Sequence, residues 1–389
     1  MFYQKCSAFI SIIFMKIYLF LPNKQIETIV LDKEIANFYK NYFKNNKKFL
    51  MLDTRFFSKN QKIFLNKNEI FISIYLKSIL KKIILRQFTV KQIYILEIIK
   101  SLNPKYILTF NDYDTFFLSL KKYFPQKKLI AICHTFRSDT TLKQLQKKLG
   151  YKKCLVDLVL MWGEKNINYY KKICKSKYFV SGSLKNNLFP IKNFNLEKKK
   201  IVFISQYRHS RVFLQQNKYY YKALLSKTMQ YVEKKNLQLV ILGNQIDQSF
   251  KEFKWYKKIL GNSKFEFKTK KNNWDSYINT INYQYFLCFS SSLGFELAAR
   301  NKRVVFFFKN KFALKNPIYN QWFIKANSGP LWTNKYSFNA IKRLLDYLIY
   351  APKTIIHKNK KKYIHPYINY DYKLQNTKKF LKKNGFRIF

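Results

Sequence analysis

The stretch FSSSLGFELAARNKRVVFF, residues 289–307, decides the expected fold of this chain. It opens at the end of one apolar run, YFLCF, and closes inside another, VVFFF, with three serines, a glycine and an Ala-rich segment between them. This order predicts a buried strand, a tight turn of small residues, a short helix and a second buried strand. Buried strands that alternate with helices are typical of a parallel sheet covered on both faces.

The same alternation recurs along the whole chain. Further apolar runs followed by polar turns are KIYLFLP from residue 16, KKFLMLDTR from 47, KYILTFND from 105, KLIAICHTF from 128, LVLMWGE from 158, KYFVSGS from 177, IVFISQYR from 201, LQLVILGN from 237 and FEFKTK from 265. Segments with helical spacing lie between these runs, for example residues 114–123, 166–175 and 219–235. The pattern therefore predicts a doubly wound α/β protein.

The length of the chain predicts two domains, because 389 residues exceed the usual size of one hydrophobic core. The short charged segment NFNLEKKK, residues 193–200, separates the two halves. We expect an N-terminal domain over residues 1–192 and a C-terminal domain over residues 193–389 that ends in a basic tail. The apolar run at residues 8–21 contains a lysine and is too short to span a bilayer as a helix. We expect the first strand to start at Met15, with residues 1–14 as an upstream extension.

The formal net charge of +55 has two explanations. A basic surface suits nucleic acid or an anionic membrane surface. Coding bias gives the same composition, because A- and T-rich codons specify Lys, Asn, Ile, Phe and Tyr together. The lysines are spread along the whole chain, which favours bias as the main cause. The five cysteines show no CxxC pairing, so we expect a reduced, cytoplasmic setting.

Polar residues directly after the apolar runs are the candidates for a binding site, because ligands of open parallel sheets bind beyond the carboxyl ends of the strands. In the first half they are Asn111, Asp112, His134, Arg137, Asp139, Gly182 and Ser183. In the second half they are Ser205, Gln206, Arg208, Gly243, Ser290, Ser291, Ser292, Gly294 and Glu296.

Glu296 is the most informative of these candidates. Small residues after a strand let the backbone approach a ligand, and the following helix offers unpaired N–H groups suited to phosphate. Glu296, expected in the first turn of that helix, could accept hydrogen bonds from the two hydroxyls of a ribose. The alternative is that Glu296 only complements the helix dipole or forms a capping box. A capping box needs a spacing of three, whereas Ser292 and Glu296 are four apart.

At these positions the chain resembles glycosyltransferases with two Rossmann domains, the GT-B fold, and in particular those of bacterial surface carbohydrate and O-antigen (lipopolysaccharide) biosynthesis. The resemblance rests on the stretch at residues 289–307 and on YILTFND, IAICHTFRSD, LMWGE, FVSGSLKNN and IVFISQYR in this order. It covers roughly residues 100 to 310. It implies two Rossmann-like domains that face a cleft.

The resemblance also implies roles for the candidate residues. The C-terminal domain would hold a nucleotide-sugar donor, with the ribose on Glu296 and the diphosphate near residues 290–294, Ser205, Gln206, Arg208 and Gly243. A glycan or lipid-linked acceptor would sit against the N-terminal domain, near Asn111, Asp112, Arg137, Asp139, Gly182 and Ser183. We expect no metal and no other cofactor, because basic side chains and a helix N-terminus can neutralise the leaving diphosphate. The expected location is the cytoplasm, in peripheral contact with the inner face of the plasma membrane.

His134 is the candidate catalytic base, since a histidine can take a proton from an acceptor hydroxyl near neutral pH. Relatives place a His or Asn here in a QHG- or QNG-like turn, whereas this chain has Cys133-His134-Thr135 without the glycine. A histidine bonded to backbone at a strand end remains the alternative. We expect Cys133 and Cys288 to be buried strand residues and not nucleophiles.

Two other functions fit parts of the sequence. A nucleotide-sugar 2-epimerase shares the fold and a comparable Ser-x-x-Glu region, but it needs additional carboxylates in the cleft. A nucleic-acid-binding protein fits only the charge, and no RNP-like strand or helix-turn-helix is recognisable. We therefore expect a glycosyltransferase and no nucleic-acid partner.

Overall fold

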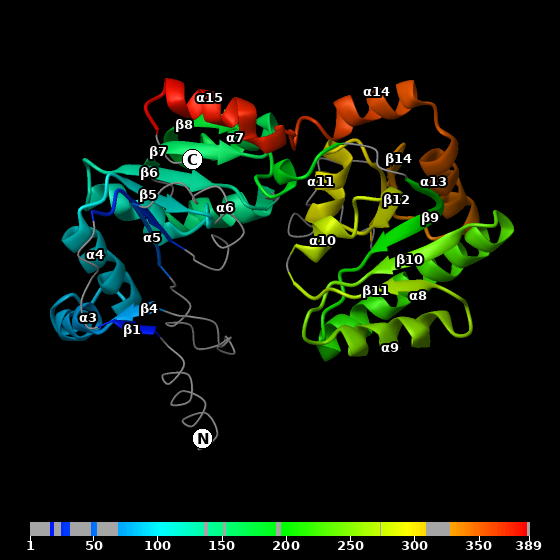
Figure 1. The fold of residues 1–389 in the computed structure, drawn as a ribbon, viewed down its shortest axis with the longest axis horizontal. Coiled ribbons are helices and arrows are strands. Elements are labelled where there is room, and N and C mark those ends of the chain that lie inside the picture. Colours follow the sequence, from blue (N-terminus) through cyan, green and yellow to red (C-terminus); the bar gives the residue numbers. More distant parts are fainter. Residues whose placement is uncertain are drawn as a thin grey trace, which may run out of the picture.

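The computed structural model describes residues 16–18, 25–31, 48–52, 69–135, 139–150, 153–191, 196–272, 274–308 and 327–386. They form two α/β lobes, each built on a parallel sheet (Figure 1). In the part of the chain that is described, no helix is both long and apolar enough to cross a membrane.

The first lobe contains a six-stranded parallel sheet in the order β3-β2-β5-β6-β7-β8. The strands are β2 (Thr28–Val30), β3 (Phe49–Met51), β5 (Tyr106–Thr109), β6 (Lys128–Ile132), β7 (Cys154–Met161) and β8 (Cys174–Val180). The helices are α3 (Ile72–Ile84), α4 (Val90–Leu102), α5 (Thr115–Ser119), α6 (Asp139–Lys148) and α7 (Glu164–Tyr170). The central strands are buried on both faces, which is why they read as continuous apolar runs.

The second lobe contains a seven-stranded sheet in the order β11-β10-β9-β12-β13-β15-β14, parallel except for β14. The strands are β9 (Glu197–Ile204), β10 (Gln238–Leu242), β11 (Glu266–Lys268), β12 (Tyr283–Cys288), β13 (Arg303–Phe307), β14 (Ser328–Gly329) and β15 (Trp332–Thr333). The helices are α8 (Arg211–Lys234), α9 (Ser249–Leu260), α10 (Asp275–Ile278), α11 (Ser292–Ala299) and α13 (Phe338–Tyr350). The strand order reverses between β9 and β12, so a crevice is expected at their carboxyl ends.

The stretch at residues 289–307 forms the predicted strand, turn, helix and strand. It contributes the end of β12, the helix α11 and the strand β13, which pairs in parallel with β12. Gly294 lies where this helix crosses the sheet, and a Cβ there would be 2.6 Å from the Cys288 Sγ and 2.9 Å from the Phe306 Cε1. A residue without a side chain is therefore required for α11 to pack closely on β12 and β13.

The two ends of the chain differ from the expectation. The run at residues 16–22 is predicted to open the first domain, but within the described residues β1 (Lys16–Tyr18) pairs with β4 (Glu69–Phe71) in a separate two-stranded sheet. The six-stranded sheet instead takes β2 from residues that carry no long apolar run. Residues 1–14 lie outside the described part of the chain.

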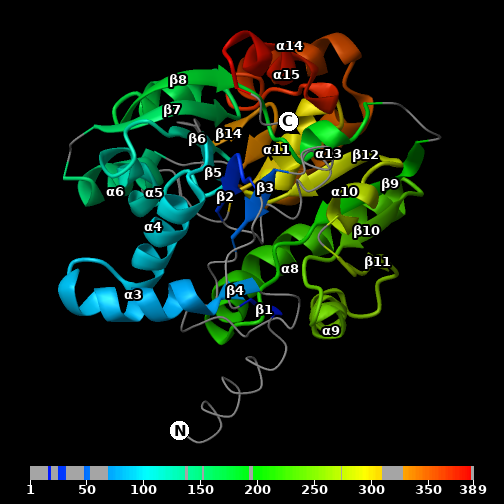
Figure 2. The ribbon, with the colours of Figure 1, turned by 60° about the vertical axis from the view of Figure 1, so that its left-hand side comes forward.

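The C-terminal segment returns to the first lobe, although the sequence assigned residues 193–389 to the second domain. Helix α14 (Lys353–Tyr363) lies on the second lobe, and α15 (Gln375–Lys383) lies beside β8 of the first (Figures 1 and 2). The ring of Phe380 on α15 stacks on Phe179 of β8 with centroids 4.2 Å apart. An amphipathic helix shows that it must bury one face, but its sequence does not say which sheet it will cover.

The link between α14 and α15, residues 364–374, crosses between the lobes and is here called the crossing segment. The Asn369 N–H donates to the Trp162 carbonyl at 2.7 Å, and the Lys165 N–H donates to the Pro366 carbonyl at 2.9 Å. A Cβ on Gly163 would lie 2.3 Å from the Tyr367 carbonyl carbon, and one on Gly182 would lie 2.2 Å from the Asn369 carbonyl oxygen. The two glycines thus let the crossing segment lie directly on the ends of β7 and β8.

Candidate active site

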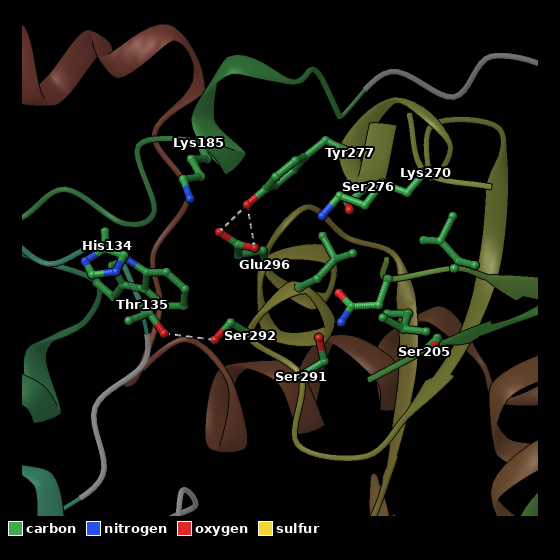
Figure 3. A pocket seen from close by; sticks show the side chains of 16 residues that line it. His134, Thr135, Lys185, Ser205, Lys270, Ser276, Tyr277, Ser291, Ser292 and Glu296 are labelled. Carbon is green, nitrogen blue, oxygen red and sulfur yellow. Dashed lines mark hydrogen bonds between the residues drawn. The ribbon is translucent and has the colours of Figure 1, made fainter. Parts of the chain in front are cut away.

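A cleft of about 390 Å³ lies between the two lobes, at the carboxyl ends of strands from both sheets (Figure 3). His134, Thr135, Trp162 and Lys185 line it from the first lobe, and Ser205, Gly243, Asn244, Lys270, Ser276, Tyr277, Ser291, Ser292 and Glu296 line it from the second. Its volume falls within the range of small-molecule sites, roughly 300–1,000 Å³. The position is the one expected for ligand sites in open parallel sheets.

Glu296 lies at the centre of this cleft (Figure 3). Its carboxylate accepts hydrogen bonds from the Ser183 hydroxyl and from the Tyr277 hydroxyl, the latter at 3.0 Å to Oε1 and 2.9 Å to Oε2. Burial raises the pKa of Glu296, while the bond from Ser183, the charge of Lys185 and the bond from Tyr277 act in the opposite direction. The carboxylate is thus a buried acceptor held by donors from both lobes.

Glu296 lies in the second turn of α11, because the helix begins at Ser292 with Ser291 as its N-cap. The expected first-turn position was one turn too early. The Ser291 hydroxyl makes no capping hydrogen bond, and Ser292 Oγ lies 3.2 Å from Thr135 Oγ1 across the cleft. The amino end of α11 therefore lies at the cleft, with Ser291, Ser292 and Glu296 all on the cleft lining (Figure 3).

Tyr277 is positioned by an aromatic contact with the first lobe. Its ring stacks on Phe189 with centroids 5.1 Å apart and an interplanar angle of 8°. The Phe189 carbonyl in turn accepts a hydrogen bond from the Tyr370 hydroxyl of the crossing segment. The crossing segment is thereby connected to the carboxylate of Glu296 through two side chains.

The floor of the cleft, at the ends of β9 and β10, rests on Glu252 of α9. This buried carboxylate accepts from the Ser205 hydroxyl at 2.5 Å and from the Asn244 and Gln245 N–H groups at 3.0 and 2.9 Å. Burial raises its pKa, against the three hydrogen bonds it receives. Because its acceptors are used inside the protein, Glu252 is a positioning residue for the loop that carries Gly243 and Asn244.

Two lysines supply positive charge to the cleft. Lys185 follows β8 and faces Glu296, and Lys270 follows β11 (Figure 3). Burial lowers the pKa of Lys270, and the carboxylates of Glu252 and Asp275 act to raise it. Anionic groups that enter the cleft thus meet ammonium groups from both lobes.

His134 lies on the first-lobe wall, directly after β6 and the isolated bridge between Asn111 and Cys133. Figure 3 shows its ring at the opposite side of the cleft from Lys270 and Ser205. Among the described residues that line the cleft, Glu296 is the single carboxylate and His134 the single imidazole.

The structure brings together some of the expected site residues and separates others. His134, Ser205, Gly243, Ser291, Ser292 and Glu296 line the cleft, and Ser183 reaches it through Glu296. The remaining described candidates, Asn111, Asp112, Gly182, Gln206, Arg208, Ser290 and Gly294, are not among its lining residues. Arg137 lies outside the described residues, and the side chain of Asp139, at the start of α6, is not described.

Three of the separated candidates have clear structural roles, and a fourth is exposed. Asp112 is fully buried and accepts a hydrogen bond from the Tyr170 hydroxyl, so it fixes α7 on the sheet. Gly182 and Gly294 are close-packing positions, at the crossing segment and under α11 respectively. Arg208 is exposed after β9. Within the described residues no three His, Cys, Asp or Glu side chains are grouped as metal ligands.

Sequence reasoning missed Tyr277, Lys270, Ser276 and Glu252. The first three lie in or beside the short α10, in a polar stretch without apolar periodicity. Glu252 lies inside an amphipathic helix, where an acidic residue is ordinarily solvated. A carboxylate at the first buried position of a helix that follows a glycine turn could have identified Glu252, but only with the fold already known.

The two parallel sheets and the cleft at their carboxyl ends define a two-domain Rossmann-like protein of the GT-B type, as predicted. The chain belongs to a family described as "putative O-antigen biosynthesis protein", whose model matches residues 130–385. This match confirms the prediction of a family in surface carbohydrate biosynthesis. It extends from β6 through α15 and so includes the cleft and the crossing segment.

Solved structures of similar fold cover nearly all of the chain. A UDP-N-acetylglucosamine 2-epimerase is 12% identical, with a TM-score of 0.54 and coverage of 94% of this chain and 97% of that one. MnaA of S. aureus, solved with UDP, is 14% identical, with a TM-score of 0.52 and coverage of 93% and 96%. The UDP-GlcNAc 2-epimerase of Methanocaldococcus jannaschii, in complex with UDP-GlcNAc and UDP, is 13% identical, with a TM-score of 0.50 and coverage of 92% and 99%. These likenesses show the fold, and no curated protein matches the chain.

Proposed function

We propose that this protein is a glycosyltransferase that moves a sugar from a nucleotide-sugar donor to a glycan or lipid-linked acceptor in surface polysaccharide biosynthesis. The observation that carries the proposal is the buried Glu296 carboxylate, which faces the cleft beside the amino end of α11 and opposite His134.

The donor ribose fits the carboxylate of Glu296. A carboxylate offers about four lone-pair positions to donors. Among the described residues, Oε1 accepts from Ser183 and Tyr277, and Oε2 accepts from Tyr277. One position on Oε2 is thus available for a ribose hydroxyl, and a second hydroxyl would take the place of the Tyr277 hydroxyl.

The donor diphosphate fits the amino end of α11. The Gly294 N–H already donates to the Ser291 carbonyl at 3.0 Å, so the N–H groups of Ser292 and Leu293 are the proposed donors, together with the positive end of the helix dipole. Lys185 and Lys270 add two ammonium groups on the rim of the same cleft. These groups would stabilise the negative charge on the departing diphosphate. Because we expect no metal in the site, this stabilisation would have to come from the protein itself.

His134 is the proposed base. It would take the proton from the acceptor hydroxyl while the hydroxyl oxygen bonds to the anomeric carbon of the sugar. The bond from that carbon to the diphosphate oxygen breaks, and the nucleoside diphosphate leaves with the electron pair. The donor is proposed to be a UDP-sugar, because two of the similar solved structures contain UDP.

A nucleotide-sugar 2-epimerase is the competing assignment, since that name belongs to solved structures of the same fold. Acid and base groups for epimerisation would have to come from the cleft. Of the described lining residues only Glu296 carries a carboxylate, and it is already bonded to Ser183 and Tyr277. This shortage favours transfer to an acceptor.

Contact with a membrane is supported by the outer face of α3. Leu80, Ile83 and Ile84 are 66%, 70% and 80% exposed, and Lys82 and Arg86 flank them. Figure 2 shows α3 at the outer margin of the first lobe. An apolar helix face with basic flanks suits the interface of an anionic bilayer, where a lipid-linked acceptor would be presented.

Thermal denaturation against UDP-, GDP-, dTDP- and CMP-sugars tests the donor assignment, with Glu296→Gln in parallel. A ligand at about one hundred times its Kd stabilises the folded state by about 2.7 kcal/mol. We expect a UDP-sugar to raise the Tm of the wild type and to raise that of the variant much less. Product analysis then separates the two activities: an isomerised sugar nucleotide formed without acceptor would replace the transferase by an epimerase.

A further inference from the structure

A second cavity, of about 340 Å³, lies on the second lobe away from the cleft. It is bounded by one face of α14, with Lys353, His357 and Lys360, and by Gln284, Asn301 and Arg303 on the opposite side. Gln284 and Arg303 stand at the amino ends of β12 and β13, whereas the active-site cleft opens at the carboxyl ends of the same strands. The two cavities therefore lie at opposite ends of the strands of one sheet. We call the second one the α14 pocket.

The α14 pocket is strongly cationic. Lys353, His357 and Lys360 share one face of the helix because they are spaced by four and three residues. Arg303 adds a guanidinium from the other wall, and the described lining contains no carboxylate. Helix α14 begins at Lys353, which lines the pocket, so the positive end of the helix dipole lies beside it.

Arg303 is held in place for binding. Its Nη1 donates to the Leu348 and Ile349 carbonyls at 3.1 and 2.8 Å, at the end of α13. A guanidinium has five N–H donors. Three donors of Arg303 therefore remain for a ligand, on a side chain whose orientation is already fixed.

Lys360 is the decisive residue. It is only 5% exposed, and its ammonium group makes no hydrogen bond or ion pair with any described residue. Burial and the charge of Arg303 lower its pKa to about 7. The pKa of the neighbouring His365 is lowered as well, by burial and by the charges of Lys360, His357 and Lys361. A buried cation among other cations is unfavourable unless an anion balances it.

We propose that the α14 pocket is a second binding site, specific for a phosphate group and separate from the nucleotide cleft. The phosphate would accept hydrogen bonds from Lys360, Arg303 and the first turn of α14. It could belong to a soluble phosphate compound or to a lipid head group, since both sources present a tetrahedral phosphate with at least one negative charge. The proposal stands independently of the sugar-transfer activity.

Calorimetric titration of the full chain with sulfate and with pyrophosphate tests the site. Lys360→Met removes the charge and keeps the apolar length of the side chain, and Lys358→Met removes an exposed charge on the same helix as a matched control. We expect the affinity to fall at least about tenfold in Lys360→Met and to stay unchanged in Lys358→Met. Because Lys360→Met also relieves a buried unpaired charge, its Tm without ligand should equal or exceed that of the wild type.

Sulfate has a constant charge near neutral pH. Any change in its affinity with pH therefore reflects ionisation of groups on the protein. Lys360 is charged below its pKa of about 7 and loses its proton above it. Sulfate affinity should therefore fall by about tenfold between about pH 6 and about pH 8.5 in the wild type. In Lys360→Met this decrease should be clearly smaller than in the wild type.

Vesicle flotation identifies the source of the phosphate. Vesicles of phosphatidylcholine alone are compared with equimolar phosphatidylcholine and phosphatidylglycerol. If Lys360→Met releases the protein from the anionic vesicles and Lys358→Met does not, the ligand is a lipid head group. If only sulfate and pyrophosphate binding depends on Lys360, the ligand is soluble. Equal binding of every probe by Lys360→Met and wild type would overturn the proposal.

Discussion

The Ser183 hydroxyl of the first lobe donates a hydrogen bond to the Glu296 carboxylate of the second. Asn186, three residues further on, donates its Nδ2–H to the Glu296 carbonyl at 2.8 Å. The loop after β8 therefore donates hydrogen bonds to both the side chain and the backbone of Glu296 on α11. Any ligand that engages the Glu296 carboxylate must compete with, or add to, a contact between the lobes.

Replacement of Glu296 should weaken donor binding. Glu296→Gln loses the charge that would accept the ribose hydroxyls, and hydrogen bonds to charged groups contribute about 1.5–3 kcal/mol. We expect the Kd for the UDP-sugar to rise by roughly ten- to one-hundredfold, measured by calorimetry. Glu233→Gln, on the exposed face of α8, is the matched control and should bind as the wild type does. Equal affinities in both variants would remove Glu296 from the donor site.

The same substitution should stabilise the protein without ligand at neutral pH. The pKa of Glu296 is raised in the folded state, so the folded protein keeps a proton that the unfolded chain releases. This group therefore lowers stability as pH rises from the unfolded value through the raised folded value. The Tm of Glu296→Gln minus that of the wild type should be near zero around pH 4 and increase toward pH 8. A constant difference across this range would contradict the buried, pKa-shifted carboxylate.

Replacement of His134 should affect chemistry and leave donor binding intact. His134→Asn removes the proposed base on the first-lobe wall, and general base catalysis is worth about 10²–10⁴ in rate. We expect kcat to fall by that factor in a transfer assay, with the donor-induced Tm shift unchanged. A kcat within a few fold of the wild type would leave His134 as a structural histidine at the end of β6.

Contact between the crossing segment and β8 can be tested with two glycines. Gly182 and Gly150 both have positive φ, +70° and +62°, but a Cβ on Gly182 would meet the Asn369 oxygen while nothing lies within 4 Å of one on Gly150. Gly150→Ala should cost about 1–2 kcal/mol of unfolding free energy from its backbone conformation alone. Gly182→Ala should cost about 1–3 kcal/mol more because of the overlap. Urea denaturation measures both, and equal losses would mean that the crossing segment does not lie on Gly182.

Membrane contact through α3 predicts that binding to anionic vesicles is lost when the exposed apolar side chains of this helix are replaced. Ile83→Gln combined with Ile84→Gln removes the two most exposed apolar side chains of the helix, each worth about 1.5–3 kcal/mol when fully buried. We expect the double variant to leave anionic vesicles in flotation, while Val212→Gln, an exposed apolar residue on α8, should not change binding. Retained flotation of the double variant would move the membrane contact to another surface.

The sequence predicted the fold and part of the site for one physical reason. Parallel strands buried on both faces read as apolar runs, and their carboxyl ends share an edge, so the polar residues that follow them converge. His134, Ser205, Gly243 and Ser291 converge in this way.

The remaining site residues could not be predicted, because their roles depend on packing between distant segments. Tyr277 is placed by a stack on Phe189, a partner that no local pattern reveals. The sequence pattern predicts Gly182 and Gly294 at ligand-binding turns, whereas the structure shows that close packing requires a glycine at both positions. A small residue after a strand serves either purpose, and only the neighbouring atoms distinguish them. For the same reason, the sequence did not predict that α15 packs beside β8 of the first lobe.

The most direct test of the central claim is a crystal structure of the protein with UDP. We predict that the ribose hydroxyls lie within hydrogen-bond distance, about 3.2 Å or less, of the Glu296 carboxylate. The diphosphate should lie against the N–H groups of the first turn of α11, between Lys185 and Lys270. A nucleotide bound elsewhere, with Glu296 still bonded only to Ser183 and Tyr277, would contradict the account.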